Sequence, residues 1–436
     1  MAGLALALAA CSSSEPAGPA PAAPAPAANS PAAAASPALA GTPVRTLAGT
    51  GEAPFDEERR LQAPAGWTVT VWARVPGARL LAWTPDQRLL VSRPKSGDIV
   101  ELVPGQGGNP PTQRTLVSGL NQPHGLAFAG DTLYVAESDQ VDAFTYKAGA
   151  LSGKRVVVDG LPDAKSSELG GAYAHALKSV AVGKDGALYV SVGSTGNVSA
   201  VDRDATPERA SILRVPAGGG AAATFAHGVR NGTGLAIDPD GAVWTAVNNR
   251  DNIAYPWDGD DKGKIFQGYV NDHPLEPLAK LTQGRDLGWP YCNPDPDVKP
   301  GDEDSPLSYG NRPFVRDIQL NPDGEKLDCA ALPRVEQGMG AHSAPLGLTF
   351  GKAGTYGEGA LVGIHGSWNR KPPRAPEVSF FAWRDGALGP QQTLLTGFQG
   401  EDGSRWGRPV MAVPGPDGAL YLSDDLAGAV YRVTTA

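Results

Sequence analysis

Short runs of alternating apolar and polar residues, separated by turn residues, recur along most of the chain. Each unit consists of an apolar run, a turn rich in Asp or Gly and a second apolar run, which is the pattern of a β-hairpin. The six predicted hairpins span residues 79–91, 124–135, 175–190, 230–244, 342–362 and 408–422. No amphipathic helical run of about 12 or more residues stands out in the body, so the pattern predicts an all-β fold.

Six similar units predict a six-bladed β-propeller with long inter-strand loops, because repeats of this period are typical of propeller blades. The units are unevenly spaced, and we expect a long insertion over residues 255–340. We also expect the apolar runs 67–73 and 429–433 to pair and close the ring. The body contains no apolar run long enough for a transmembrane helix.

The first fifty residues have a different composition. Residues 8–11 read Leu-Ala-Ala-Cys after a short apolar run, which is the form of a lipobox whose cysteine is acylated. We therefore predict a lipoprotein signal peptide over 1–11, an Ala/Pro-rich disordered tether over 12–52 and the propeller over 53–436. The protein is then expected to be exported, periplasmic or at the cell surface, with Cys11 as its lipid anchor. A plain secretory leader with an incidental cysteine is the alternative.

The composition narrows the function classes. The high counts of Gly (56) and Pro (40) fit a body rich in turns. The net charge of −9 and the absence of a Lys/Arg block argue against a nucleic-acid partner. Besides Cys11 the chain has Cys292 and Cys329, which could form a disulfide in an oxidising compartment or remain two buried thiols.

A basic residue precedes the predicted inner strand in every unit. These residues are Arg79, His124, His175, Arg230, His342 and Arg408. The inner strands of a propeller surround its central channel, so we expect these side chains to gather at one mouth of the channel. A ring of cations repels itself, and arginine binds planar carboxylates well, so the pattern predicts a small polyanionic ligand on the axis. The alternative is that the side chains pair with carboxylates of the blades or face solvent.

Several motifs carry a resemblance over about residues 60–434. They are Gln122-Pro-His-Gly125, Val192-Gly-Ser-Thr195, Val229-Arg-Asn-Gly232, Asn248-Asn-Arg-Asp251, Gly288-Trp-Pro-Tyr-Cys292, His342-Ser-Ala-Pro-Leu346, His365-Gly-Ser-Trp-Asn-Arg370 and Arg408-Pro-Val410. In this order the chain resembles the glucose/sorbosone dehydrogenases, and most of all their sorbosone dehydrogenase-like branch. The resemblance implies a six-bladed propeller that oxidises a sugar with pyrroloquinoline quinone (PQQ) and calcium.

The resemblance also implies roles for individual residues. His175 falls at the position of the general base, and Arg230 at a catalytic position beside the quinone. The residues expected to bind the cofactor are Arg230, Asn231, His365, Arg370, Arg405, Arg408, His124 and His342. The turn of Asn249, Arg250 and Asp251 falls where relatives hold calcium with oxygen atoms, although a plain Asn-rich turn is the alternative.

Two departures from the family pattern bear on activity. Ser194 stands where some family members have an aspartate that orients the base, and Gly196 and Ser199 stand where sorbosone-like relatives tend to have cysteines. Serine can orient an imidazole but adds no charge to stabilise its protonated form.

Three functions compete at this point. The first is a PQQ- and calcium-dependent sugar dehydrogenase with a small sugar substrate and a separate electron acceptor. The second is a six-bladed calcium lactonase, which would need carboxylates and Asn at the axis where this chain has Arg and His. The third is a non-catalytic propeller that binds a glycan or a protein at the cell surface.

Overall fold

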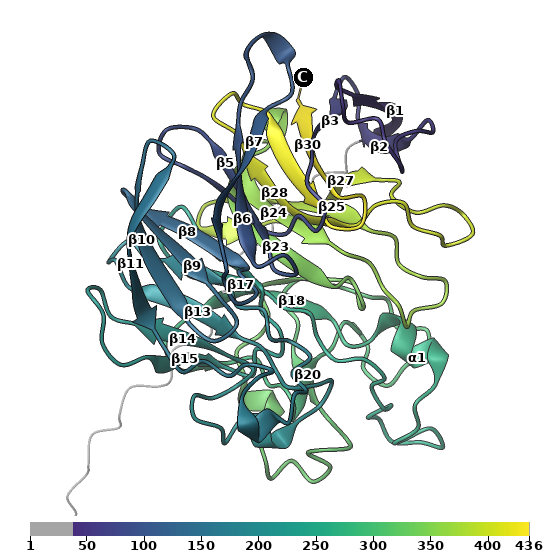
Figure 1. The fold of residues 1–436 in the computed structure, drawn as a ribbon. Coiled ribbons are helices and arrows are strands. Elements are labelled where there is room, and N and C mark those ends of the chain that lie inside the picture. Colours follow the sequence, from purple (N-terminus) through teal and green to yellow (C-terminus); the bar gives the residue numbers. More distant parts are fainter. Residues whose placement is uncertain (1–37, 436) are drawn as a thin grey trace, which may run out of the picture. The chain divides into compact units, whose positions relative to one another are not determined.

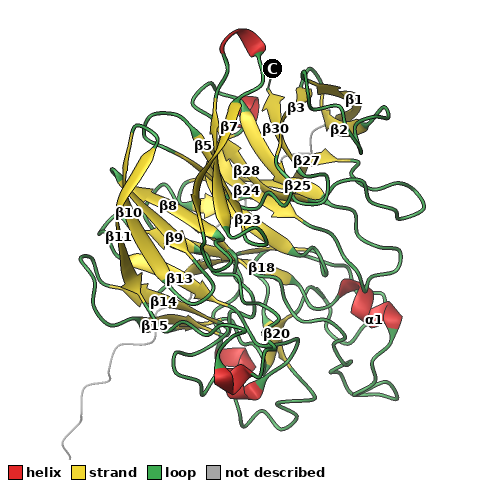
Figure 2. Cartoon of the chain, viewed as in Figure 1, coloured by secondary structure: helices red, strands yellow, loops and turns green. Residues whose placement is uncertain are grey.

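The computed structural model describes residues 38–435, which form an all-β, propeller-like fold with little helix (Figures 1 and 2). Its one α-helix within these residues is α1 (Gln267–Asp272), and five short 3-10 turns are the other helical elements in this part of the chain. No helix among the described residues is long and apolar enough to cross a membrane. The predicted signal peptide and most of the predicted tether lie outside the described residues.

Four antiparallel sheets each contain one of the first four predicted hairpins. The first sheet contains β4 (Leu81–Trp83), β5 (Leu89–Arg93), β6 (Asp98–Val103) and β7 (Thr112–Ser118), and the second contains β8 (Gly125–Ala129), β9 (Thr132–Ala136), β10 (Val141–Lys147) and β11 (Ala150–Val158). The third contains β12 (Val180–Val182), β13 (Leu188–Val192), β14 (Ser211–Val215) and β15 (Ala223–His227), and β19 (Arg285–Asp286) pairs parallel with β15. The fourth contains β16 (Gly234–Ile237), β17 (Val243–Ala246), β18 (Glu276–Leu281) and β22 (Gln337–Met339).

A fifth, longer sheet contains the last two hairpins. One antiparallel run within it is β23 (Pro345–Lys352), β24 (Glu358–Ile364), β25 (Glu377–Arg384) and β27 (Gln392–Thr396), with β26 (Ala387–Leu388) paired to β25. The other run is β28 (Pro409–Pro414), β29 (Leu420–Asp424), β30 (Ala429–Thr434) and β3 (Thr68–Arg74). The two runs are joined through β1 (Leu39–Thr46) and β2 (Arg60–Pro64), and the single residue pair Gln62–Thr396 links β2 to β27. The six separate sheets expected for six blades are therefore seen only in part.

The predicted disordered tether over 12–52 extends too far, because residues 39–46 within it form the strand β1. Leu39 to Pro43 pair antiparallel with β2, and Val44 to Thr46 pair parallel with β3. Pro43 does not prevent this pairing, because it is the last residue of β1 that pairs with β2, and it is exposed. Residues 39–46 therefore belong to the sheet, so the predicted start of the propeller at residue 53 is too late.

The first strands of the six hairpins lie next to one another in a closed series. β4 contacts β8, β8 contacts β12, β12 contacts β16, β16 contacts β23, β23 contacts β28, and β28 contacts β4. Glycines allow this approach: a Cβ on Gly125 of β8 would lie 2.6 Å from the Cα of Ser179, and one on Gly347 of β23 would lie 2.5 Å from the Cβ of Met411. Each first strand therefore begins close to the beginnings of its neighbours.

Apolar residues of adjacent sheets form the core between them. Val141 of β10, Val190 of β13 and Leu213 of β14 are at most 1% exposed and belong to one cluster. Trp244 of β17 is 1% exposed, packs with Leu348 of β23, and donates its Nε1–H to Asp238 Oδ2 at 2.8 Å. Burial of each such apolar side chain contributes about 1.5–3 kcal/mol to the stability of the fold. The apolar faces of neighbouring sheets therefore hold the sheets together.

The predicted hairpins and the predicted closure are confirmed. All six hairpins are antiparallel pairs, β4–β5, β8–β9, β12–β13, β16–β17, β23–β24 and β28–β29. β3 pairs antiparallel with β30, as expected for residues 67–73 and 429–433. The segment 255–340 is not an insertion throughout, because β18 and β22 within it complete the sheet of β16 and β17.

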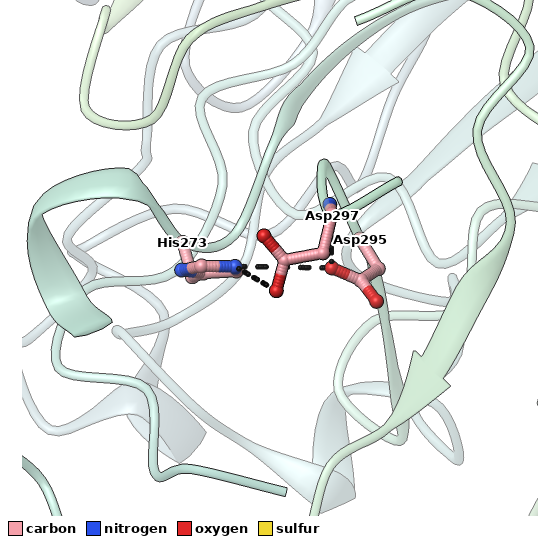
Figure 3. A group of neighbouring side chains, drawn as sticks. All are labelled: His273, Asp295 and Asp297. Atoms are coloured by element: carbon pink, nitrogen blue, oxygen red, sulfur yellow. Dashed lines mark hydrogen bonds and ion pairs between the residues drawn. The ribbon is translucent and has the colours of Figure 1, made fainter. Parts of the chain in front are cut away.

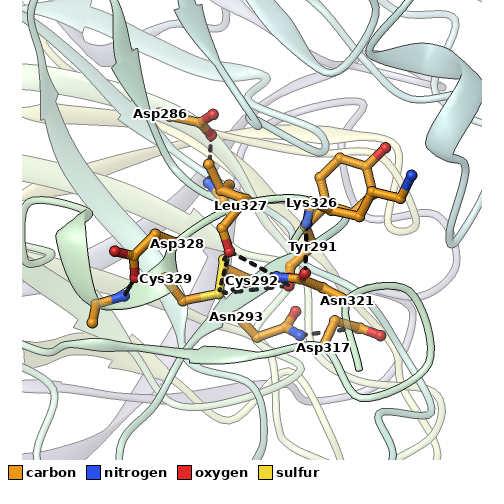
Figure 4. The surroundings of a disulfide bond; sticks show 12 residues. Asp286, Tyr291, Cys292, Asn293, Asp317, Asn321, Lys326, Leu327, Asp328 and Cys329 are labelled. Atoms are coloured by element: carbon orange, nitrogen blue, oxygen red, sulfur yellow. Dashed lines mark hydrogen bonds between the residues drawn. A yellow bond between two sulfur atoms is a disulfide. The ribbon is translucent and has the colours of Figure 1, made fainter. Parts of the chain in front are cut away.

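A disulfide fastens the insertion. Cys292 in β20 (Cys292–Pro294) is bonded to Cys329, which starts a 3-10 turn; β20 pairs with β21 (Phe314–Arg316) (Figure 4). Asn293 Nδ2 donates to Asp317 Oδ2 at 3.0 Å beside the disulfide. The predicted disulfide between Cys292 and Cys329 is therefore confirmed, and the alternative of two buried thiols is not.

Candidate functional site

A pocket of about 310 Å³ opens near the starts of the first strands. Its lining residues are Gly77, Arg79, Pro94, Lys95, Leu177, His365, Arg408, Asp425 and Leu426. Arg79 precedes β4, Arg408 precedes β28 and His365 follows β24, so segments far apart in sequence meet here. We call this cavity the axial pocket.

One carboxylate, Asp425, partly neutralises the predicted ring of cations. Arg79 Nη1 donates to Asp425 Oδ2 at 2.8 Å, and His365 Nε2 is 2.8 Å from Asp425 Oδ1. The two partners, after the opposing effect of burial, hold the pKa of Asp425 well below its usual range. At Arg79 the alternative of pairing with a carboxylate of the blades is therefore confirmed, because Asp425, the residue after β29, supplies the counter-charge.

His124 contacts the side chain of Arg79 but does not line the axial pocket. Its side chain is fully buried, its Nδ1 is 3.1 Å from the carbonyl oxygen of Lys178, and its Nε2 is 3.5 Å from Arg79 Nη2. Burial, together with the charge of Arg79, lowers the pKa of His124 to about 3. The predicted cofactor ligand is thus a neutral acceptor that positions the arginine.

The axial pocket keeps an excess of positive charge. Arg408 donates from Nε to the carbonyl oxygen of His365 at 2.9 Å, and within residues 38–435 it has no carboxylate in ion-pair range. Burial and the neighbouring charge of Arg405 lower the pKa of Arg408. Arg79 Nε is buried and makes no hydrogen bond, and exposed Lys95 adds a further cation to the lining. An anion with several carboxylates would complement this lining.

Arg405 and Arg370 occupy different surroundings. Arg405 donates from Nε to Gln399 Oε1 at 2.8 Å and from Nη2 to the carbonyl oxygen of Ser367, so it braces the loop that carries His365. Arg370 donates from Nε to the carbonyl oxygen of Asn271 at 3.1 Å, at the end of α1, and does not line the axial pocket. Of the two alternatives for a further cation, His365 and Arg370, the structure brings only His365 to the pocket.

His175 lies two residues before Leu177 of the pocket lining. The hydroxyl of Ser194 donates to the carbonyl oxygen of Gly196 at 2.7 Å, so its oxygen must accept from His175 Nδ1, which lies 2.9 Å away. The proton of the neutral ring is thereby fixed on Nδ1, and the lone pair is on Nε2. Burial and the charge of Arg230 lower the pKa of His175 to about 3. The half-buried ring can therefore accept a proton at Nε2 at neutral pH.

Arg230 fixes the loop next to His175. Its Nε donates to the carbonyl oxygen of Asn197 at 3.1 Å, and its Nη1 donates to the carbonyl oxygen of Asn248 at 3.0 Å. Burial is the main cause that lowers the pKa of Arg230, to about 10, so the side chain remains charged at neutral pH. The adjacent Asn231 is 7% exposed, and its Oδ1 would lie 3.2 Å from a Cβ at Gly193. The structure thus brings Arg230, Asn231 and His175 together as the sequence predicts.

His342 forms a second ion pair of the basic group. Its Nδ1 lies 3.2 Å from Asp251 Oδ1 and its Nε2 lies 2.6 Å from the carbonyl oxygen of Val270. Burial opposes protonation, but Asp251, Glu276 and the carbonyl of Val270 raise the pKa of His342. The neighbouring Glu276 is fully buried, which raises its pKa to about 8. The pKa of His342 is therefore shifted in the opposite direction to that of His175.

The predicted metal turn is held by hydrogen bonds to other groups. Asn249 Nδ2 donates to the carbonyl oxygen of Leu275 at 3.2 Å, and the side chain of Arg250 forms an ion pair with Asp317. The carbonyl oxygen of Asp251 accepts from Asn197 Nδ2 at 2.9 Å. The turn is therefore connected through Asp317 to the disulfide region, and its role as a calcium site stays a prediction.

The family follows from a match along the whole body. Residues 61–436 match the family model described as TrAA12-like. The chain belongs to the TrAA12-like family.

Two curated relatives resemble parts of this TrAA12-like chain. An uncharacterized protein of Borreliella burgdorferi is 24% identical over 257 residues, which is 57% of this chain and 58% of that protein. A PQQ-dependent pyranose dehydrogenase of Coprinopsis cinerea is 25% identical over 293 residues, which is 56% of this chain and 37% of that protein. The chain thus spans less than two thirds of the length of either relative.

Solved structures share the fold of the TrAA12-like body. The PQQ domain of the Coprinopsis cinerea pyranose dehydrogenase, in its holo form, has a TM-score of 0.71 and 19% identity over 90% of this chain and 100% of that domain. A family AA12 carbohydrate-active enzyme of Trichoderma reesei has a TM-score of 0.66 and 21% identity over 86% of this chain and 97% of that structure. The PQQ-bound aldose sugar dehydrogenase of Streptomyces coelicolor has a TM-score of 0.51 and 16% identity over 85% of this chain and 100% of that structure. These likenesses establish the architecture.

Sequence reasoning missed two sets of residues in this TrAA12-like chain. Asp425 follows a predicted strand, but nothing in its surroundings marks it as the partner of Arg79, which is 346 positions away. The other set is a buried group of His273, Asp295 and Asp297 in the insertion, whose ligand atoms lie within 4.8 Å of one another (Figure 3). The string Asn293-Pro-Asp-Pro-Asp297 is a signal that could have drawn attention to it.

Proposed function

We propose that this chain is an oxidoreductase that oxidises a sugar, with PQQ bound in the axial pocket and His175 as the general base. Two observations carry the proposal: a cationic pocket in which Arg408 has no carboxylate partner among the described residues, and a neutral histidine, two residues before Leu177 of the pocket lining, whose Nε2 carries a lone pair. The names of the Coprinopsis and Streptomyces relatives, a PQQ-dependent pyranose dehydrogenase and a PQQ-bound aldose sugar dehydrogenase, support it.

The lining of the axial pocket fits the proposed cofactor. PQQ has three carboxylates and an ortho-quinone, and when bound it supplies an acceptor for two electrons. Arg79, Lys95 and Arg408 would offset the carboxylate charge, and buried Arg79 Nε is a donor that none of the described residues uses. We place Arg230 and Asn231 beside the quinone because they adjoin His175. His342 and Arg405 would act at a distance, by holding Asp251 and the loop of His365.

His175 would take a proton from the sugar hydroxyl at Nε2. Ser194 keeps the lone pair on that atom, and Arg230 stabilises negative charge that develops nearby. Bound carboxylates would raise the pKa of His175 from about 3 towards neutrality, because they favour the imidazolium form. The anionic cofactor would therefore make the histidine a stronger base than it is alone.

Calcium belongs to this proposal. The oxygen atoms of the turn 248–251, including the carboxylate of Asp251, are the chain's candidates for a hard cation beside the axial pocket. We also propose that the long sheet contains two blades, which gives six blades in all. The closed series of first strands, β4, β8, β12, β16, β23 and β28, supports this count.

We further propose that the protein is exported and lipid-anchored through Cys11. The lipobox supports the anchor, and the Cys292–Cys329 disulfide supports an oxidising compartment. Incorporation of labelled fatty acid that is lost in Cys11→Ala would test the anchor, while unchanged labelling would refute it.

A turnover assay tests the proposed reaction. The full chain is loaded with PQQ and calcium, and dye reduction is followed with a panel of aldoses. We expect turnover that requires PQQ and falls by about 100-fold or more in His175→Gln, since general-base catalysis contributes 10²–10⁴-fold.

His227→Gln is the matched control. His227 ends β15, pairs with Glu208 at 2.6 Å and does not line the axial pocket, so this variant should keep its activity. PQQ binding without turnover on any sugar would contradict the dehydrogenase activity and favour the alternative of a non-catalytic binding propeller. Absence of PQQ binding would refute the proposal as a whole.

A further inference from the structure

A second group of titratable side chains lies in the insertion, apart from the lining of the axial pocket. His273 follows α1, and Asp295 and Asp297 follow β20 (Figure 3). The three residues are 6%, 2% and 6% exposed. His273 Nε2 lies 3.1 Å from Asp297 Oδ2 and 3.8 Å from Asp295 Oδ1. One nitrogen and two carboxylates thus point towards a common centre.

The hydrogen bonding of His273 directs a lone pair at this centre. Its Nδ1 lies 2.9 Å from the carbonyl oxygen of Tyr269, which can only accept, so Nδ1 carries a proton and donates it. The ring also stacks on Tyr269, with ring centres 3.8 Å apart, and this fixes its direction. Nε2 is buried and makes no hydrogen bond of acceptable geometry, even though two carboxylate oxygens are near it. A histidine that donates Nδ1–H to a carbonyl and presents Nε2 is arranged as metal-ligating histidines are.

The two carboxylates have no basic side chain as a partner among the described residues other than His273. Arg312 is the nearest candidate, but it donates to the backbone carbonyl oxygens of Asp295 and Asp297 and not to their side chains. Asp295 Oδ1 accepts only the backbone N–H of Asp297, at 3.0 Å. Two buried carboxylates beside an imidazole lone pair repel one another unless a cation lies among them.

The surroundings give a cation a route to the centre. His273 and Asp297 line a pocket of about 420 Å³, separate in its lining from the axial pocket. Asp272, Asp302 and Glu303 also line it, and the last two are exposed. Acidic residues at the mouth of a cleft raise the local concentration of cations. Because His273 and Asp297 line this pocket, water or another ligand could reach the bound ion from it.

We propose that His273, Asp295 and Asp297 bind a divalent transition-metal ion, with zinc as the reference case. Zinc lies about 2.0–2.2 Å from nitrogen and oxygen ligands, so two ligand atoms on one ion are at most about 4.2 Å apart. The two separations from His273 Nε2, 3.1 and 3.8 Å, meet this limit, and the three ligand atoms all lie within 4.8 Å of one another. An imidazole ligand favours zinc, copper, iron or nickel over calcium, which prefers six to eight oxygen atoms.

The proposed ion would hold the insertion near the functional site. α1 precedes His273, and the carbonyl oxygen of Val270 in α1 accepts from His342. Asp295 and Asp297 follow Cys292 on the disulfide-bonded loop. Metal binding would therefore couple two segments of the insertion to each other and, through α1, to the basic group at the axis.

Calorimetric titration of the metal-free protein tests this site. The full chain carries Cys11→Ser and no histidine tag, so that neither can bind the ion, and it is titrated with ZnCl₂ alone and with CaCl₂ alone. We expect one zinc per chain at micromolar affinity or tighter, and much weaker binding of calcium. His273→Gln and Asp297→Asn should each weaken zinc binding by more than about 100-fold, because loss of even an outer-shell partner costs 10–100-fold.

Asp258→Asn is the control, since Asp258 is an exposed carboxylate of the same insertion that pairs with Lys262. It should bind zinc as the parent chain does. If a variant at the centre fails to fold, histidine NMR of the parent chain decides: zinc should shift the His273 resonance and leave that of His227 in place. Zinc binding weaker than millimolar, tighter binding of calcium than of zinc, or a zinc response at His227 with none at His273 would overturn the proposal.

Discussion

Replacing Ser194 by aspartate tests how the structure sets the basicity of His175. Ser194 Oγ lies 2.9 Å from His175 Nδ1, so a carboxylate at this position would lie about 4 Å from the imidazole charge. At an effective dielectric constant of about 20, a pair at about 4 Å interacts by ~4 kcal/mol. Because one pKa unit corresponds to about 1.36 kcal/mol, this energy is equivalent to about three units. Solvent at the half-buried ring reduces it, and we expect the pKa of His175 to rise by at least about two units, from about 3 to 5–6.

Histidine Cε1–H resonances report this change directly. The chain has six histidines, so each titration can be followed separately, and His175→Gln identifies the resonance of interest. Ser194→Ala should change the pKa little, because the carbonyl oxygen of Ser194, at 3.1 Å, still accepts from Nδ1. Unchanged titration of the other five histidines would show that the fold is intact. A pKa near 6.5 in the parent chain, or no increase in Ser194→Asp, would refute the reasoning.

Three further predictions concern stability and charge. His124 is fully buried, and its pKa of about 3 lies below the value of about 6.5 in the unfolded chain, so the folded protein loses stability as the pH falls below 6.5. Unfolding curves should therefore show that the free energy of unfolding falls by about 2 kcal/mol between pH 7.5 and pH 5. This loss should be absent in His124→Gln. Reduction of Cys292–Cys329, which closes a loop with a sequence separation of 37, should lower the free energy of unfolding of the insertion by up to about 4 kcal/mol, and an unchanged melting curve under reductant would contradict this. Asp425→Asn removes the only carboxylate of the axial lining, so calorimetry should show citrate binding about 5- to 10-fold tighter, and unchanged affinity would mean that the field of the pocket does not govern anion binding.

The repeating elements could be predicted from the sequence because their causes are local. Each hairpin follows from an alternating pattern and a turn, such as Asp185-Gly186 between β12 and β13, where Gly186 has a φ of 78°. The closure of β3 on β30 was also predicted, from the apolar runs 67–73 and 429–433 at the two ends of the series of hairpins. The tether was predicted wrongly over β1, because the strand is formed by pairing with β2 and β3, and that pairing is not visible in the composition of the segment.

The basic residues of the site were predictable as a set, but their individual surroundings were not. Their position before the first strands predicted that they gather, and the structure brings Arg79 and Arg408 together in the axial pocket and His175 and Arg230 together beside Ser194. The sequence could not show that Asp425 lies between Arg79 and His365, because that contact depends on how two blades meet. For the same reason the sequence grouped Arg370 with the pocket residues, whereas the fold turns it towards Asp272 beside α1.

The most direct test of the central proposal is the affinity of the full chain for PQQ, measured by equilibrium dialysis at two salt concentrations. We predict one PQQ per chain, weaker binding at higher salt, and a loss of at least about 10-fold in Arg408→Gln, because a charged hydrogen bond contributes about 1.5–3 kcal/mol. Arg384→Gln, at an exposed arginine at the end of β25, should bind PQQ as the parent chain does. Absence of saturable binding, or equal affinity in Arg408→Gln and the parent chain, would contradict the assignment of the axial pocket as the cofactor site.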